Sequence, residues 1–215
     1  MVGMRPSLLL IATLAAIPVA TGVERGGREA FFESFKRPQK FCGTNQACLD
    51  HPLIASSKEE LEWLHAHGYP SLRELRRLRA LSKERLQAEA SSGSTNAMIV
   101  LGTRLANEKR EAEGLEQLLR AANAGSLYAH YLIADAYARS TNPPDQVEGL
   151  AHLRVAALMG DWKAAAQYDR RSEALASAER LLVEERASAL LTIYAKDGVT
   201  DPRPLKPPPT PSAHR

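Results

Sequence analysis

The 215-residue chain lacks the alternating runs of valine, isoleucine and threonine that mark β-strands, which argues against a sheet. Its formal net charge of +3 is too small to indicate a nucleic-acid partner. It also lacks a glycine-rich phosphate loop, a His-Glu-x-x-His helix and a nucleophile elbow, so no catalytic residue is assigned. Because 44% of its residues are hydrophobic, the chain is able to form one domain with a core.

Cysteine is scarce too, since the chain holds only Cys42 and Cys48. In an exported chain, which the amino terminus described next indicates, this even number favours a disulfide between them. The alternative is a metal site that adds His51 and one of His65 and His67, but it has no standard ligand spacing. We therefore predict no metal and no cofactor.

Residues 1–22 have the pattern of a secretory signal peptide. A short positive start precedes the apolar run 7–20, and small residues suited to cleavage follow at Ala20-Thr21-Gly22. An uncleaved membrane anchor is the alternative, although the run is short for a span and Pro18 interrupts it. We predict a periplasmic or secreted protein that is attached to a membrane only if the leader is retained.

Three segments should follow the leader. Residues 23–56 form a Phe-rich amino-terminal segment with the cysteine pair, residues 57–198 a helical repeat domain, and residues 199–215 a Pro-rich disordered tail. The four phenylalanines should pack on the helices or on a partner, because leaving them in water is costly. The prolines prevent the tail from forming a helix, and a strip for a proline-binding groove is the alternative to a tail without a role.

The helical domain nearly repeats itself, because four small or apolar landmarks occur three times. They are Leu86, Ala90, Gly93 and Ala97, then Leu118, Ala122, Gly125 and Ala129, then Leu153, Ala157, Gly160 and Ala164. Glu113-Gly114-Leu115 likewise returns as Glu148-Gly149-Leu150. Apolar residues in steps of three and four predict helices over 94–107, 111–124, 128–140 and 145–159, with a degenerate third pair over 162–195. The glycine after each second helix suits a position with positive φ.

Two Ser-x-x-Glu patterns, at Ser57 and Ser71, predict helix starts before this region. One side of the second of these helices is rich in charge. It carries Arg73, Arg76, Arg77, Arg79, Lys83 and Arg85 against Glu74, Glu84 and Glu89. The side is either a basic patch for an anionic partner or membrane surface, or the solvated cap of a helical stack.

The pattern Ala97-x3-Leu101-Gly102, followed by Gly114-Leu115-x2-Leu118-x2-Ala121-Ala122-x2-Gly125-x3-Ala129, resembles the Sel1-like repeat family, relatives of the tetratricopeptide repeats. The resemblance covers about residues 82–168. It implies an all-α fold, a right-handed α-α superhelix of stacked helix hairpins whose inner face binds proteins. The chain departs from the family at 107–110, where Asn-Glu-Lys-Arg replaces a glycine-containing loop. A plain tetratricopeptide-like solenoid and an irregular helical domain are the alternatives.

By comparison with tetratricopeptide repeats, the inner face is lined by first-helix positions opposite the apolar stripe. The candidate binding residues are Thr103, Asn107, Tyr128, Tyr131, Asp135 and Arg139. Tyr131, Asp135 and Arg139 share one helix face, and tyrosine and arginine often anchor interfaces. The alternative for each residue is a surface position without a partner, or for Tyr131 a core position.

These observations predict an exported interaction module or scaffold that binds a protein or peptide in the cell envelope, with no catalysis. The alternative is a cell-wall-directed enzyme or ligand-binding protein that uses a groove carboxylate such as Asp135.

Overall fold

The structure is a computed structural model that describes residues 50–140, 145–195 and 201–205. All regular elements in these ranges are α-helices, as the lack of strand patterns predicted. None of these helices is both long enough and apolar enough to cross a membrane. The signal peptide, the phenylalanine cluster and the predicted disulfide between Cys42 and Cys48 lie outside the described residues.

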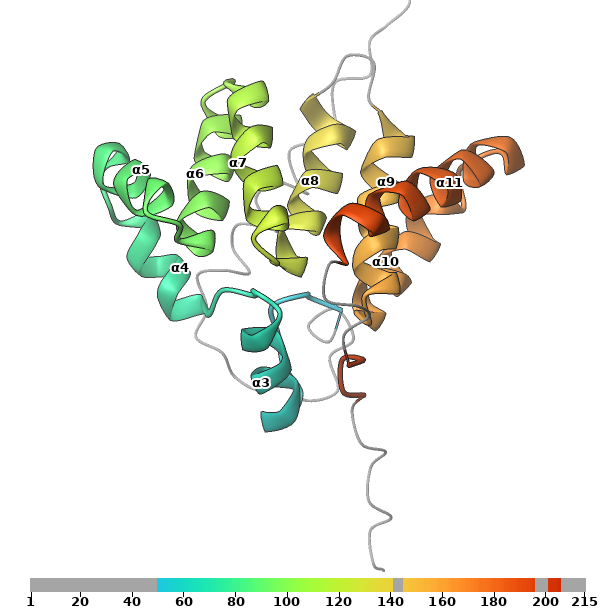
Figure 1. Cartoon of the computed structure of the whole chain (residues 1–215), viewed down its shortest axis with the longest axis horizontal. Coiled ribbons are helices and arrows are strands. Elements are labelled where there is room, and N and C mark those ends of the chain that lie inside the picture. Colours follow the sequence, from blue (N-terminus) through green and yellow to red (C-terminus); the bar gives the residue numbers. More distant parts are fainter. Residues whose placement is uncertain (1–49, 141–144, 196–200, 206–215) are drawn as a thin grey trace, which may run out of the picture. The chain divides into compact units, whose positions relative to one another are not determined.

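In chain order the helices are α3 (Lys58–Ala66), α4 (Leu72–Arg79), α5 (Lys83–Ser91), α6 (Thr95–Asn107), α7 (Glu111–Asn123), α8 (Leu127–Ser140), α9 (Gln146–Leu158), α10 (Trp162–Ser172) and α11 (Ser177–Tyr194). The bounds of α6 to α9 match the predicted ranges to within one residue. The expected positive φ is confirmed at Gly93, Gly125 and Gly160, with values of 95°, 91° and 100°. Figure 1 shows α5 to α9 following one another, each packed on the next.

Serine side chains cap the three helices of the amino-terminal part. The Oγ atoms of Ser57 and Ser71 accept the amides of Glu60 and Glu74, each at 3.1 Å, as the two Ser-x-x-Glu patterns predicted. Ser82, which sequence reasoning did not single out, caps α5 by accepting the amide of Arg85 at 3.4 Å.

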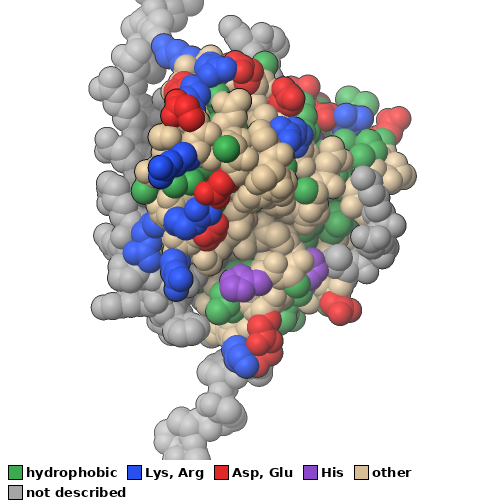
Figure 2. All heavy atoms as spheres, turned by 60° about the vertical axis from the view of Figure 1, so that its left-hand side comes forward, with side chains coloured by type: hydrophobic (Ala, Val, Ile, Leu, Met, Phe, Trp, Pro, Cys, Tyr) green, Lys and Arg blue, Asp and Glu red, His purple; other side chains and the backbone are tan. Residues whose placement is uncertain are grey.

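The charged side that was predicted on one helix is divided between α4 and α5, and part of it forms ion pairs. Arg77 bridges Glu74 at 2.9 Å and Glu89 at 2.6 Å, and Lys83 pairs with Glu108 at 2.6 Å. Figure 2 shows positive and negative side chains interspersed over the face that includes this side. This mixture favours a solvated helical face over a basic patch of one sign.

A glycine at the same position of the repeated pattern lies at the close contact between the two helices in each central hairpin. A Cβ added to Gly114 of α7 would lie 2.7 Å from the carbonyl oxygen of Gly102 in α6. A Cβ added to Gly149 of α9 would lie 3.0 Å from the carbonyl oxygen of Ala134 in α8. The glycine of each Glu-Gly-Leu segment therefore allows the second helix to touch the backbone of the first.

The last two helices differ from the predicted third pair. Residues 162–195 do form two helices, but α11 packs mainly on α9 rather than on α10, and Figure 1 shows it crossing α9. Its buried residues are only the narrow stripe Val183, Ala187 and Leu190. Such a stripe is wide enough for one neighbouring helix, so α11 covers α9 instead of forming a hairpin with α10.

We expect Gly114→Ala to lower the free energy of unfolding by about 1 to 2 kcal/mol. The added methyl group meets the Gly102 carbonyl, and this overpacking outweighs the roughly 1 kcal/mol that alanine gains in helix propensity. Urea denaturation measures the change. Gly149→Ala, where the nearest atom is farther away, should cost less, and a stabilised Gly114→Ala variant would contradict the close approach of α6 and α7.

Candidate functional site

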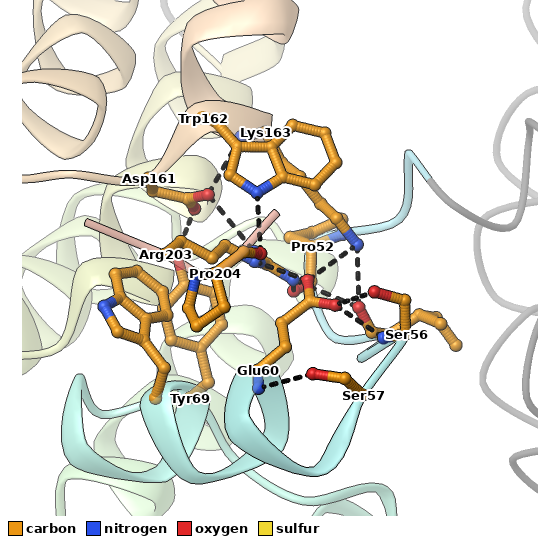
Figure 3. Close-up of polar contacts among 12 residues, drawn as sticks. Pro52, Ser56, Ser57, Glu60, Tyr69, Asp161, Trp162, Lys163, Arg203 and Pro204 are labelled. Atoms are coloured by element: carbon orange, nitrogen blue, oxygen red, sulfur yellow. Dashed lines mark hydrogen bonds and ion pairs between the residues drawn. The ribbon is translucent and has the colours of Figure 1, made fainter. Parts of the chain in front are cut away.

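Four charged side chains from distant parts of the sequence meet in the interior (Figure 3). Glu60 comes from α3, Asp161 and Lys163 from the start of α10, and Arg203 from the segment 201–205. Their exposed fractions are 0%, 0%, 2% and 2%, respectively. Charges this deeply buried are tolerated only when they are paired and hydrogen-bonded, so the contacts of each one define the site.

The guanidinium of Arg203 lies at the centre of this cluster. Its Nε donates to Glu60 Oε1 at 2.7 Å and its Nη1 donates to Asp161 Oδ1 at 3.2 Å. Its Nη2 donates to the carbonyl oxygens of Pro52 and Ile54, at 3.0 and 3.1 Å. Burial opposes the charge, but the neighbouring carboxylates raise the pKa of Arg203 above its ordinary value. Arg203 is therefore a buried cation in which each guanidinium nitrogen donates to at least one acceptor.

Three aromatic rings surround the same guanidinium. Its carbon lies 5.6 Å from the ring centre of Trp63, 5.7 Å from that of Tyr69 and 5.9 Å from that of Trp162. These distances are within the range of cation–π attraction. Trp63 and Trp162 are the only two tryptophans of the chain. We call the site formed by these three rings with Glu60 and Asp161 the arginine pocket.

Asp161 is positioned by local structure and by two tyrosines. As the N-cap of α10, its Oδ1 accepts the amide of Lys163 at 3.0 Å. Its Oδ2 accepts the hydroxyl of Tyr131 at 2.6 Å and that of Tyr69. Burial and the charge of Asp161 raise the pKa of both tyrosines well above the ordinary value, so both hydroxyls stay protonated and donate.

Glu60 and Lys163 form the other side of the cluster. Glu60 Oε2 accepts the hydroxyl of Ser56 at 2.7 Å, and Lys163 Nζ lies 3.4 Å from Glu60 Oε1. Lys163 Nζ also donates to the carbonyl oxygen of Ile54 at 2.7 Å. Burial acts to raise the pKa of Glu60, but the hydrogen bonds of Ser56 and the nearby cations hold it below its ordinary value. Burial, together with Arg203, lowers the pKa of Lys163 to about 8.

Residues 201–205 are also held through their backbone. Trp63 Nε1 donates to the carbonyl of Asp201 at 2.7 Å, and Trp162 Nε1 donates to that of Pro204 at 3.4 Å. The amide of Arg203 donates to the carbonyl of Gly160 at 2.9 Å. Arg203 is the one fully buried side chain of these five residues. A segment without regular secondary structure therefore places one side chain in the pocket.

The expectation of a disordered tail over 199–215 does not hold for residues 201–205, which dock on the helical domain. Residues 201–205 form no helix, as the prolines predicted, but proline is compatible with a segment that docks by one side chain. Residues 199, 200 and 206–215 lie outside the described residues.

The six predicted binding residues do not form one surface. Tyr131 belongs to the charged cluster, and Tyr128 is buried beside it with ring centres 6.2 Å apart. Thr103 donates its hydroxyl to the carbonyl of Ile99 in its own helix at 2.9 Å, and Asn107 is exposed at the end of α6. The structure thus brings two of these four residues to the pocket.

Asp135 and Arg139 lie outside the pocket, toward the far end of α8. They form an ion pair at 3.7 Å, and Asp135 also pairs with Arg171 of α10 at 3.1 Å. The Arg139 side chain is 49% exposed and that of Asp135 is 33% exposed, so neither is buried. Binding by the six residues stays a prediction.

Sequence reasoning missed Glu60, Asp161, Lys163 and Arg203 as members of a site. Glu60 was assigned to a capping box, yet its carboxylate contacts Ser56 and Arg203 instead of the helix cap. A usable signal was the aspartate after Gly160, which is typical of an N-cap. No sequence signal joins Glu60 to Arg203, because 143 positions separate them.

A second buried cluster holds α11 against α8 and α9. The Nδ1 atoms of His130 and His152 lie 3.0 Å apart, so one ring donates and the other accepts. Tyr194 of α11 packs on both rings, with centres 4.8 and 5.8 Å away. His152 Nε2 lies 3.8 Å from Glu148, which is itself paired with Arg186. Burial lowers the pKa of His152 to about 4 and that of His130 well below its ordinary value.

No family model matches the chain, and no curated protein or solved structure matches it either. The interpretation of the pocket therefore depends on its own geometry.

We expect Arg203→Ala to lower the free energy of unfolding by about 3 to 5 kcal/mol, because it leaves two buried carboxylates without their main partner. Arg203→Lys should restore only part of this loss, since one ammonium cannot reach both carboxylates as the guanidinium does. Urea denaturation of the full chain measures both changes. Arg180→Ala, at an exposed arginine of α11, should change stability by less than about 0.5 kcal/mol, and equal effects at the two positions would contradict the pairing.

The histidine pair makes stability depend on pH. The folded-state pKa of His152, about 4, lies below its unfolded value near 6.5, so the unfolded chain takes up the proton first as pH falls. Between pH 6.5 and 4 this residue should cost on the order of 3 kcal/mol of stability. The His152→Gln variant keeps a polar partner for His130, but glutamine does not titrate. Urea denaturation at pH 7, 5.5 and 4.5 should therefore show a smaller fall in the free energy of unfolding than in the natural chain. An unchanged pH dependence would show that His152 is not buried and neutral.

Proposed function

We propose that this protein is a helical-repeat interaction module that binds an extended peptide segment of a protein partner. The observation that carries the proposal is the docking of residues 201–205. Side chains and carbonyls from α3, from the α9–α10 junction and from the segment before α3 hold this segment by its backbone and by one inserted side chain. Extended peptides are recognised in this way, with main-chain hydrogen bonds for affinity and a pocket for selectivity.

The chemistry of the pocket supports the binding of a cationic side chain. Glu60 and Asp161 each accept several hydrogen bonds and pair with the same arginine. The pKa of Glu60 is held below its ordinary value, so this carboxylate stays charged and able to hold a cation. The resemblance to Sel1-like repeats supports the same function. From the predicted signal peptide we propose the cell envelope as the compartment of the partner.

Selection from a library of random displayed peptides tests this function on the full chain. We expect enriched peptides that bind saturably with one-to-one stoichiometry and dissociation constants in the micromolar range, about −8 kcal/mol. Both the natural chain and the Arg203→Ala variant serve as targets, so that the docked segment does not mask the pocket. If neither target enriches any peptide above background, the proposed function is wrong.

Two variants locate the bound peptide. Asp161→Asn should weaken a peptide that enters the arginine pocket, whereas Asp135→Arg should weaken one that lies on the exposed ion pair of α8. Glu173→Gln, at an exposed carboxylate just after α10, is the matched control and should change neither affinity. Circular dichroism of each variant shows whether the fold is intact.

A further inference from the structure

The segment in the arginine pocket is preorganised for docking. Pro202 and Pro204 flank Arg203, and each proline fixes its own φ and lacks an N–H group. The amide of Arg203 is therefore the only backbone donor in the triplet, and the carbonyl of Gly160 accepts it at 2.9 Å. A segment in which two prolines already fix φ loses less conformational freedom on binding, which favours recognition of a short stretch.

The pocket discriminates by shape as well as by charge. The three nitrogens of the Arg203 guanidinium meet four acceptors: Nε meets Glu60, Nη1 meets Asp161, and Nη2 meets the carbonyls of Pro52 and Ile54. A planar guanidinium satisfies all of these at once, whereas a lysine ammonium is a single point with no fixed fork. The three surrounding rings add attraction for a flat cation.

Each carboxylate keeps other partners if the segment leaves. Asp161 retains the hydroxyls of Tyr69 and Tyr131 and the amide of Lys163. Glu60 retains the hydroxyl of Ser56 and the ammonium of Lys163, 3.4 Å away. Without Arg203, the pocket would contain the two carboxylates of Glu60 and Asp161 and the one ammonium of Lys163. Its excess negative charge would favour the binding of another cation. Departure of Arg203 also removes a charge that, besides burial, lowers the pKa of Lys163, which favours the protonated ammonium beside Glu60.

We propose that the arginine pocket receives an arginine from an extended, proline-flanked segment of a partner protein, and that residues 201–205 occupy it as an intramolecular competitor. This inference rests on the proposed function and specifies its ligand and its regulation. The docked segment shares its chain with the pocket, so its effective concentration is on the order of millimolar. A partner segment displaces it by making additional contacts beyond the five residues or by being present at high local concentration.

Binding of a labelled, capped peptide with the sequence Asp-Pro-Arg-Pro-Leu to the full chain tests the proposal. We expect the Arg203→Ala variant to bind this peptide roughly 10-fold or more tightly than the natural chain does, because its own segment competes less. A peptide in which lysine replaces the arginine should bind at least about 10-fold more weakly. Fluorescence anisotropy measures the affinity. Tryptophan emission reports on the pocket itself, because both tryptophans of the chain line it.

Two further measurements keep the test decisive if Arg203→Ala folds poorly. Addition of the arginine peptide should restore helical circular dichroism and raise the melting temperature of the variant, and the lysine peptide should not. In the natural chain, millimolar arginine peptide should change tryptophan emission in a saturable way. If neither effect occurs, the proposal is overturned.

Other outcomes separate this proposal from the proposed function. Equal affinity for the arginine and lysine peptides would overturn the arginine pocket as a receptor site. Library-selected peptides that lack arginine would also overturn it. The same holds for selected peptides that the Asp135→Arg variant no longer binds and the Asp161→Asn variant still binds. In these cases the proposed function stands, because the chain still binds a peptide. If the Asp161→Asn variant no longer binds the arginine peptide and the Glu173→Gln variant still does, the result supports both the proposed function and the arginine pocket as its receptor site.

Discussion

A buried guanidinium is the constraint on which this structure depends. Arg203 is 2% exposed, and a cation at that depth needs opposite charges and hydrogen-bond acceptors around it. Glu60 from α3, Asp161 from the start of α10 and the carbonyls before α3 supply them. The cluster thereby fixes both ends of the described chain to its middle. Breaking it would expose buried carboxylates rather than merely release a tail.

Two kinds of interaction stabilise the fold, one between neighbouring helices and one between distant parts of the chain. The hairpins α6–α7 and α8–α9 are local, with glycine contacts and apolar stripes between helices that are neighbours in sequence. The charged cluster is long-range and polar, since it joins residues 42 and 143 positions apart. Because polar clusters are directional, this one also specifies which side chain fits, and the inferred preference for arginine follows from that property.

The fold was predictable where its determinants are local. The helix bounds of α6 to α9 and the positive φ of Gly93, Gly125 and Gly160 follow from periodicity and capping within one helix. The packing of α11 on α9 rather than α10 was not predictable, since it depends on which neighbour accepts the narrow stripe of Val183, Ala187 and Leu190. Of the predicted binding residues, Tyr131 alone contributes a hydrogen bond to the cluster.

The sequence by itself determined that the chain is helical, where its central hairpins begin and end, and that residues 201–205 cannot be a helix. Each of these properties depends on residues within a few positions of one another. Only the tertiary structure decided that Arg203 is buried and that Glu60 and Asp161 surround it, because these partners lie 143 and 42 positions away. Pairing over such distances is selected by the geometry of the packed helices, which no single segment contains.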